Sequence, residues 1–307
     1  MINQTRDVTE SNFYGVITNI INPDYWDKSN SDFKKHYKRM LSDSRVWVAL
    51  GTHPHFADHM TEQRWSQLEL LVSGNSDQFP WLRVVAVGEC GLDYSPKNTV
   101  PKDVQKKVFA RQIYIALRHR LPIVLHIRDA EQDGLEVLAK CGVPADYPMH
   151  RHCFGGNSRA AHHFLTTYPG SKIGVTGLVT YPYAWDAQAV IRETDLDKIL
   201  LETDAPYFLP QNAARNIYNC AFPGHVIHVA IKVAEIKKMS LKQVLEHNLI
   251  NSREIYPKFF LNKTYNVAVV RAKVIDETNK NVMDNEDDDK PKVVIAKPKL
   301  LNRITSQ

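Results

Sequence analysis

Short runs of apolar, largely β-branched residues alternate along the chain with segments whose apolar positions recur at helical spacing. The short runs are typical of buried strands, and the periodic segments are typical of helices that cover a sheet. The predicted strands are FYGVITNII (13–21), VWVALG (46–51), RVVAVGE (83–89), PIVLHI (122–127), MHRHCF (149–154), KIGVTGLVTY (172–181) and KILLETDAPYF (198–208). This alternation predicts a parallel α/β sheet, either a barrel or a doubly wound sheet.

Three predicted helices carry recognisable end signals. Thr61 precedes EQRWSQLELLVS as an N-cap, Pro101 stands near the start of a helix that runs to residue 119, and Gly142 closes DGLEVLAKC. Further helices are predicted over 24–43, 158–170, 185–194, 224–238 and 241–252. Seven strands are visible along the chain, whereas a closed (β/α)8 barrel has eight.

The alternating pattern breaks beyond residue 260, where the acidic run NEDDDKPK is followed by basic and polar residues. Such a segment cannot bury enough apolar surface to offset the entropy of ordering it. We therefore predict one barrel domain over residues 1–262 and a polar, flexible C-terminal tail over residues 263–307.

Composition narrows the class of protein. The 307 residues, 43% of them hydrophobic, suffice for one large core, and the net charge of +5 permits an anionic substrate without requiring one. The chain has neither a GxGxxG turn nor a P-loop, which argues against the commonest nucleotide-binding folds.

No apolar run reaches membrane-spanning length, and MINQTRDV lacks a signal-peptide core, so we expect an intracellular protein, cytoplasmic or nuclear, without membrane contact. Four scattered cysteines without a CxxC pair fit a reducing compartment.

Four of the predicted strands end at a side chain that can bind a metal or transfer a proton, namely Glu89, His126, His152 and Asp204. Parallel sheets and barrels gather their chemistry at the carboxyl ends of the strands, so these residues can meet at one site. Two histidines and two carboxylates suit divalent ions with mixed nitrogen and oxygen ligands. Each residue alone also has a structural interpretation: a cap or salt bridge for Glu89, a core histidine for His126, and a turn before proline for Asp204.

Residues near these strand ends have secondary roles. His150 and His152 alternate in one strand and should face the same side, with one of them as a ligand. Glu202 should share a face with Asp204 and could support a neighbouring ligand. Asp93 in GECGLDY is expected to form loop hydrogen bonds and not to bind a metal.

Two further motifs could contact a substrate. His53 and His55 form an HxH, but Pro54 and the loop position argue against both binding one metal, which leaves phosphate contact or loop packing. Arg128 could pair with Asp129 or with a substrate phosphate.

In this order, GTHPH, GECGLDY, PIVLHIRD, RHCFGG and LLETDAPYFLP resemble the successive motifs of the TatD family of metal-dependent deoxyribonucleases, which are amidohydrolase-like TIM barrels. The resemblance covers residues 13–260. It is strongest to the animal TatD-domain-containing-2 branch, through HPHFA, HRHCF and LVTYPYAWDA.

This resemblance implies a (β/α)8-type barrel with two divalent ions, of the Mg²⁺ or Zn²⁺ type, that hydrolyses phosphodiester bonds of DNA or sometimes RNA. Glu89 would bridge the two ions, and His126 and His152 would bind the second ion. Asp204 would bind the first ion and help to deprotonate the attacking water, and His55 would lie near the scissile phosphate. The resemblance implies nucleic acid as the partner, and nothing in the sequence indicates an obligate protein partner.

One departure from the family pattern bears on activity. The family opens with a strand that ends in DxHxH, and none of the residues before Phe13 is histidine; His53 and His55 match the later GxHPH motif. We therefore expect a barrel that lacks its first strand and a first metal site without its two imidazoles, with impaired turnover. Two alternatives stay open: a catalytically inactive barrel that acts as a binding protein, and an amidohydrolase-type enzyme for a small molecule.

Overall fold

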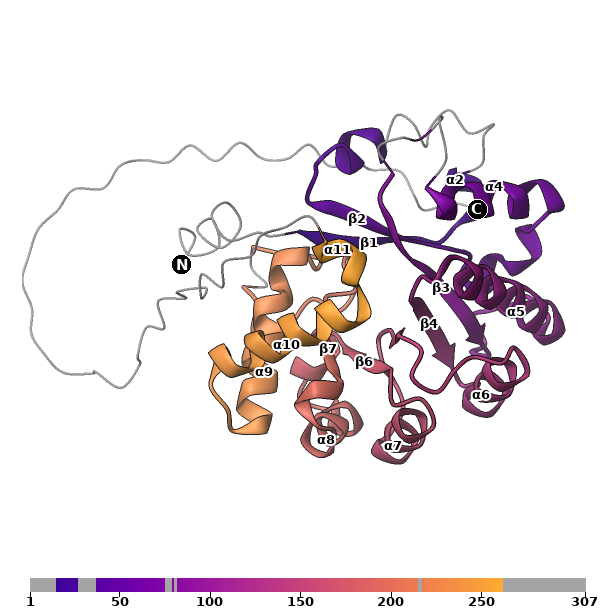
Figure 1. The fold of residues 1–307 in the computed structure, drawn as a ribbon. Coiled ribbons are helices and arrows are strands. Elements are labelled where there is room, and N and C mark those ends of the chain that lie inside the picture. The colour runs from indigo at the N-terminus through magenta and orange to yellow at the C-terminus, as the bar shows by residue number, and fades with distance from the viewer. Residues whose placement is uncertain (1–14, 27–36, 75–78, 80–81, 215–216, 262–307) are drawn as a thin grey trace, which may run out of the picture. The chain divides into compact units, whose positions relative to one another are not determined.

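The computed structural model describes residues 15–26, 37–74, 79, 82–214 and 217–261 (Figure 1). Seven parallel strands form one sheet in the order of the sequence. They are β1 (Val16–Ile20), β2 (Val46–Leu50), β3 (Val84–Asp93), β4 (Ile123–Arg128), β5 (Met149–Arg151), β6 (Lys172–Val175) and β7 (Ile199–Leu201). Within the described residues β7 does not pair with β1, so the sheet is curved but open.

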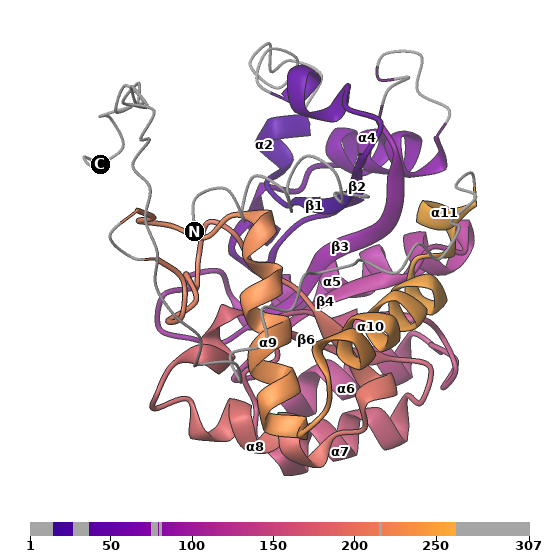
Figure 2. The same cartoon turned by 90° about the vertical axis from the view of Figure 1, so that its left-hand side faces the viewer.

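Helices cover the outer face of the sheet (Figure 2). The α-helices are α2 (Pro23–Trp26), α4 (Glu62–Ser73), α5 (Lys102–His119), α6 (Glu131–Lys140), α7 (Ser158–Thr167), α8 (Trp185–Glu193), α9 (Val226–Lys237), α10 (Leu241–Ile255) and α11 (Pro257–Phe260). Within the described residues, four 3-10 helices lie in the connections between these elements: η1 (Pro54–His59), η2 (Gly177–Thr180), η3 (Leu196–Lys198) and η4 (Pro223–His225). The prediction of a parallel α/β sheet is confirmed, as are the Thr61 cap, which accepts from Arg64 N, and the left-handed Gly142.

Apolar side chains form two core clusters. The larger one fills the space between the strands and the covering helices, and Trp26, Phe109 and Phe164 are among its largest fully buried side chains. The smaller one joins residues of β2, β3, β4 and β7 to the end of α10 and to α11, through residues such as Tyr256 and Phe259. The last helices of the described chain are thus part of the core of the sheet.

Three predicted strands are shorter than expected. The one predicted over 149–154 ends at Arg151, so His152 directly follows the strand. The segment predicted as one strand over 172–181 is a strand only to Val175, because Thr176 caps a 3-10 turn by accepting from Leu178 N. The last strand ends at Leu201, so Asp204 lies in the following loop with a φ of 52°. Strand alternation therefore does not set the direction of this carboxylate.

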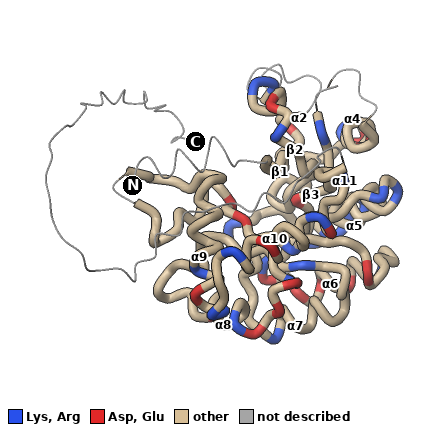
Figure 3. The backbone as a smooth tube through the Cα atoms, turned by 60° about the vertical axis from the view of Figure 1, so that its left-hand side comes forward, with Lys and Arg blue, Asp and Glu red and all other residues tan. Residues whose placement is uncertain are grey.

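Charged positions of both signs occur on the peripheral helices, including α6 and α8 (Figure 3). None of the helices in the described part of the chain is long and apolar enough to cross a membrane. The predicted tail over 263–307 lies outside the described residues, so the division into two domains stays a prediction.

Candidate metal centre

Glu89 is the buried carboxylate around which the candidate site is arranged. It lies within β3, where the pairing with β4 shifts register between Gly88 and Cys90. Such an irregularity re-aims a side chain, and it is common beside functional sites. Glycine at position 91 permits the close approach of the two strands, because a Cβ there would overlap the carbonyl of His126. The sequence from Gly88 to Asp93 thereby brings Glu89 and His126 together near the carboxyl ends of β3 and β4.

Two imidazoles face the Glu89 carboxylate. His126 Nδ1 lies 3.9 Å and His152 Nε2 lies 3.7 Å from Glu89 Oε2. One donor atom from each of the three side chains lies within 4.8 Å of the others, a spacing that one metal ion can bridge. The amide Nδ2 of Asn19 donates to the other oxygen, Glu89 Oε1. This bond connects β1 to the site and orients the carboxylate.

Asp204 approaches the same group from the loop after β7. Its Oδ1 lies 3.7 Å from His152 Nε2. Burial raises the pKa of Asp204 to about 6, and the negative charges of Glu202 and Glu89 add to the rise. A cation would stabilise the ionised form of this crowded group of carboxylates, which is the expected chemistry of a metal site.

Glu202 orients His152. Its Oε2 lies 2.9 Å from His152 Nδ1, and its Oε1 accepts a hydrogen bond from Cys153 N at 2.5 Å. Although burial opposes it, the charges of His152 and His150 lower the pKa of Glu202 to about 2. With Nδ1 engaged by a carboxylate, Nε2 of His152 is directed at Glu89 and Asp204, as is usual for a metal-binding histidine.

Asp93 plays the same part for His126. Its Oδ2 lies 3.1 Å from His126 Nε2 and 3.1 Å from His55 Nε2, while Oδ1 accepts from Ser95 N. The carboxylate leaves His126 with Nδ1 toward Glu89. Asp93 forms hydrogen bonds, as expected, but it bonds two histidines of the site and not only its own loop.

His53 is a second histidine beside His126, with ring centroids 4.2 Å apart. Burial, together with the neighbouring His126 and His55, holds the pKa of His53 well below its usual value. A neutral imidazole remains available as a ligand, and His53, Asp93 and His126 form another group with donor atoms at metal-binding distances.

His150 and His152 lie on the same side, as the alternation of the strand predicts, since both approach Glu202 Oε2. His150 Nδ1 is hydrogen-bonded to the hydroxyl of Tyr256, at 2.6 Å. Burial lowers the pKa of His150, which supports Glu202 beside the candidate ligands.

Sequence reasoning missed Asn19 and Tyr256. Asn19 is the polar residue near the end of an apolar strand, the same pattern that indicated the other site residues, so it could have been found. Tyr256 lies 106 residues beyond His150 at the end of a helix, and no local pattern connects the two.

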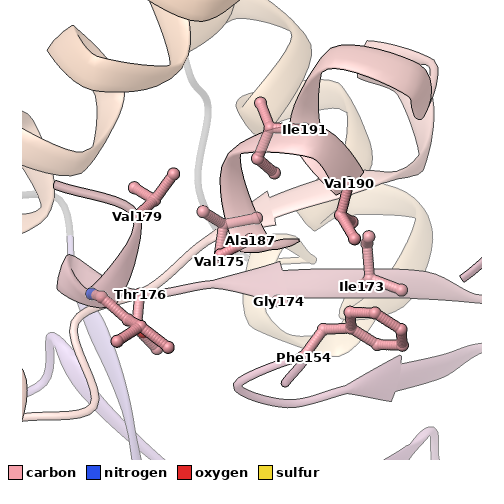
Figure 4. A pocket seen from close by; sticks show the side chains of 10 residues that line it. Phe154, Ile173, Gly174, Val175, Thr176, Val179, Ala187, Val190 and Ile191 are labelled. Carbon is pink, nitrogen blue, oxygen red and sulfur yellow. The ribbon is translucent and has the colours of Figure 1, made fainter. Parts of the chain in front are cut away.

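The structure brings Glu89, His126, His152 and Asp204 together and places His55 beside them through Asp93. Arg128 is different: its side chain is exposed, and among the described residues it forms no ion pair with Asp129. A small hollow between β6 and α8 is a separate feature, since apolar side chains such as Ile173, Val190 and Ile191 line it (Figure 4).

Comparison with known proteins agrees with this geometry. Residues 2–257 match the family described as TatD related DNase. The chain is 38% identical over 221 residues to the human 3'-5' RNA nuclease TATDN2. The aligned residues make up 72% of this chain but only 28% of the human protein. It is 32% identical over 213 residues to the uncharacterized metal-dependent hydrolase YabD of Bacillus subtilis, covering 69% of this chain and 77% of YabD.

Solved structures show the same fold. YJJV, a TatD homolog from Escherichia coli, superposes with a TM-score of 0.64 at 24% identity, over 80% of this chain and 86% of that one. A TatD family hydrolase from Entamoeba histolytica gives 0.64 at 23% identity, over 79% and 84%. The fold is therefore α/β and TIM-barrel-like, of the amidohydrolase type, with seven parallel strands in an open sheet. Together, the matched residues and the clustering of histidines and carboxylates establish that the chain belongs to the TatD related DNase family.

Proposed function

We propose that the chain is a metal-dependent hydrolase that cleaves phosphodiester bonds in single-stranded DNA or RNA. The observation that carries this proposal is the convergence of Glu89, His126, His152 and Asp204 at the carboxyl edge of one parallel sheet. Support comes from the family and from relatives whose names describe nucleases, such as the 3'-5' ssDNA/RNA exonuclease TatD of Pectobacterium carotovorum, 31% identical over 197 residues.

The donor set fits two divalent ions of the Mg²⁺ or Zn²⁺ type. Glu89 and Asp204 would hold the first ion, and Glu89, His126 and His152 would hold the second. Bound ions of this kind act as Lewis acids and lower the pKa of water near them. Mixed carboxylate and imidazole ligands suit such ions better than a cluster of thiolates would.

The protein side chains have distinct tasks in hydrolysis. Asp204 accepts the proton of the attacking water, since bound cations would keep its carboxylate ionised and its Oδ1 lies 3.7 Å from His152 Nε2, beside the other candidate ligands. Glu202 and Asp93 hold His152 and His126 in the orientation that ligation needs. His55 contacts the scissile phosphate from beside Asp93, and the exposed Arg128 pairs with a phosphate of the bound strand.

We also predict that this chain turns over its substrate slowly. Residues 1–21 contain no DxHxH motif, the motif that in the family pattern supplies two imidazoles to the first ion. In two-metal hydrolysis the ions stabilise both the attacking and the leaving oxygen, so a weakly held ion reduces the rate.

Substitution of Asp204 by asparagine tests the proposal. Asp204→Asn keeps the shape and tolerates the φ of 52° but loses the proton acceptor, so hydrolysis of a labelled single-stranded oligonucleotide with Mg²⁺, Mn²⁺ or Zn²⁺ should fall about 100-fold or more. Asp129→Asn is a matched control, because Asp129 also has a φ of 52° and follows a strand of the same sheet. An unchanged metal-dependent rate for Asp204→Asn would refute the assigned role, and wild-type protein without metal-dependent cleavage would refute the function.

A further inference from the structure

Tyr183, in the loop after η2, and Trp185, the first residue of α8, form an exposed aromatic pair. Their side chains are 82% and 70% exposed, and their rings are 5.9 Å apart at 85° to each other. Two large aromatic side chains that stay together in solvent contribute little to the core. Contiguous exposed apolar surface of this kind is typical of a binding site.

The segment that carries the pair is held in place by hydrogen bonds. Ala184 N donates to Tyr181 O at 3.2 Å, and the Gln188 side chain donates to both Val179 O and Tyr181 O. The aromatic rings are therefore presented by an ordered turn. Such preorganisation lowers the entropic cost of binding a ligand.

The same segment is connected to the loop that carries Asp204. The Tyr181 hydroxyl donates to Leu209 O at 3.1 Å, and Tyr207 N donates to Asp204 O at 2.8 Å. Tyr207 is itself 67% exposed. The loops after β6 and β7 thus form one bonded unit, with the candidate metal ligand and exposed aromatic rings on it.

Exposed basic residues follow the neighbouring strands at the same edge of the sheet. Lys97 lies after β3, Arg128 ends β4, and Arg159 lies in the first turn of α7, after β5. Positive charge at these loops complements the phosphates of a nucleic acid strand. The edge therefore offers phosphate contacts after the earlier strands and aromatic faces after the later ones.

We propose that Tyr183 and Trp185 form a base-stacking subsite for single-stranded nucleic acid beside the metal centre. The proposal rests on the proposed function, since it assigns the position of bases next to the bond that is cleaved. Aromatic faces bind unpaired bases of any sequence, whereas the bases of a duplex are already stacked on each other. The pair would therefore favour single strands over duplexes without selecting a sequence.

Binding and hydrolysis can be measured separately to test this subsite. The Kd of a fluorescently labelled single-stranded oligonucleotide is determined by anisotropy for the Asp204→Asn protein, alone and combined with Trp185→Ala or Tyr183→Ala. Loss of one stacking ring should raise the Kd roughly tenfold. In the protein with Asp204 intact, the same changes should raise the KM for the oligonucleotide but leave hydrolysis of bis(p-nitrophenyl) phosphate unchanged, because that small ester has no neighbouring nucleotides to place a base on the pair.

Tyr114→Ala is the matched control, since Tyr114 is 52% exposed on α5, away from the loops after β6 and β7, and should alter neither value. A raised Kd for the Tyr183 and Trp185 variants supports the subsite even if the protein hydrolyses nothing, in which case only the proposed function fails. Equal Kd values for all variants, or a wild-type chain that binds no oligonucleotide, would overturn it. So would a dimer that Trp185→Ala dissociates while oligonucleotide binding is unaffected, which would assign the pair to a contact between copies.

Discussion

Glu202 illustrates how much of the site depends on residues that do not themselves face the candidate ions. One carboxylate oxygen engages His152 and the other accepts from Cys153 N, so both oxygens are engaged. Glutamine has the same shape but only one acceptor oxygen, and its amide group would face the second donor. Partners of this kind strengthen a ligand histidine by fixing its orientation.

Glu202→Gln should therefore weaken metal binding about 10- to 100-fold while the protein stays folded. Calorimetric titration with Mn²⁺ or Zn²⁺ measures the affinity, and circular dichroism checks the fold. Glu193→Gln, an exposed position at the end of α8, should leave the affinity unchanged. Equal affinities for the two variants would contradict the orienting role.

At this scale, sequence reasoning anticipates residues whose neighbours carry a pattern. Glu89 and His126 follow apolar runs in the chain, and both lie in the candidate site. The contact between His150 and Tyr256 could not be anticipated, because it depends on how the last helix packs against the sheet. Arg128 lies at the expected strand end, but a strand end alone does not decide whether a long side chain reaches the cluster.

At the scale of single elements, strand β6 leaves space for the Glu202 side chain, a role that cannot be read from its sequence. A Cβ at Gly174 would overlap the Glu202 carboxylate and crowd His150 Nε2. Glycine at this position of the strand leaves the space in which Glu202 reaches His152. The requirement comes from close approach, because the backbone at Gly174 does not have a left-handed φ.

Gly174→Ala should destabilise the protein by about 1–3 kcal/mol, the usual cost of overpacking, and should also lower metal affinity by displacing Glu202. Urea unfolding with and without divalent cation measures both effects. Gly155→Ala serves as the comparison, since a Cβ there meets only Cys153 O at 3.9 Å. If the two variants are equally stable, the spacing role of Gly174 is wrong.

Element types were predictable from sequence, and some element ends were not. Helix α4 begins where Thr61 predicts, because the cap is a local interaction of side chain and backbone. The predicted strand over 172–181 gives way to η2 after Val175, where the chain packs against the loop after β7. Residues Gly177–Thr180 look like a strand in sequence, but they form a 3-10 turn in which Gly177, Val179 and Thr180 are buried.

For the whole molecule, the number of strands follows from the alternating pattern. The sequential strand order does not, because a doubly wound sheet has the same alternation, and it is implied only by the resemblance to a barrel family. The packing against the inner face of the sheet is less predictable from sequence. Ile255, Tyr256 and Phe259 join the smaller core cluster from the C-terminal side of the described chain, and their spacing in sequence does not distinguish this from an ordinary helix surface.

The candidate metal centre joins side chains from β3, β4, the end of β5 and the loop after β7, so bound ions would connect widely separated parts of the sheet. A ligand that binds only the folded state stabilises it by about 2.7 kcal/mol when its concentration is a hundredfold above Kd. Saturating Mn²⁺ or Zn²⁺ should therefore raise the Tm of the wild-type chain, a chelator should reverse the rise, and Asp204→Asn should reduce it. Differential scanning calorimetry over a range of cation concentrations measures this dependence. A Tm that does not change with cation concentration would show that the folded chain holds no ion, and the two-ion proposal would then fail independently of any activity assay.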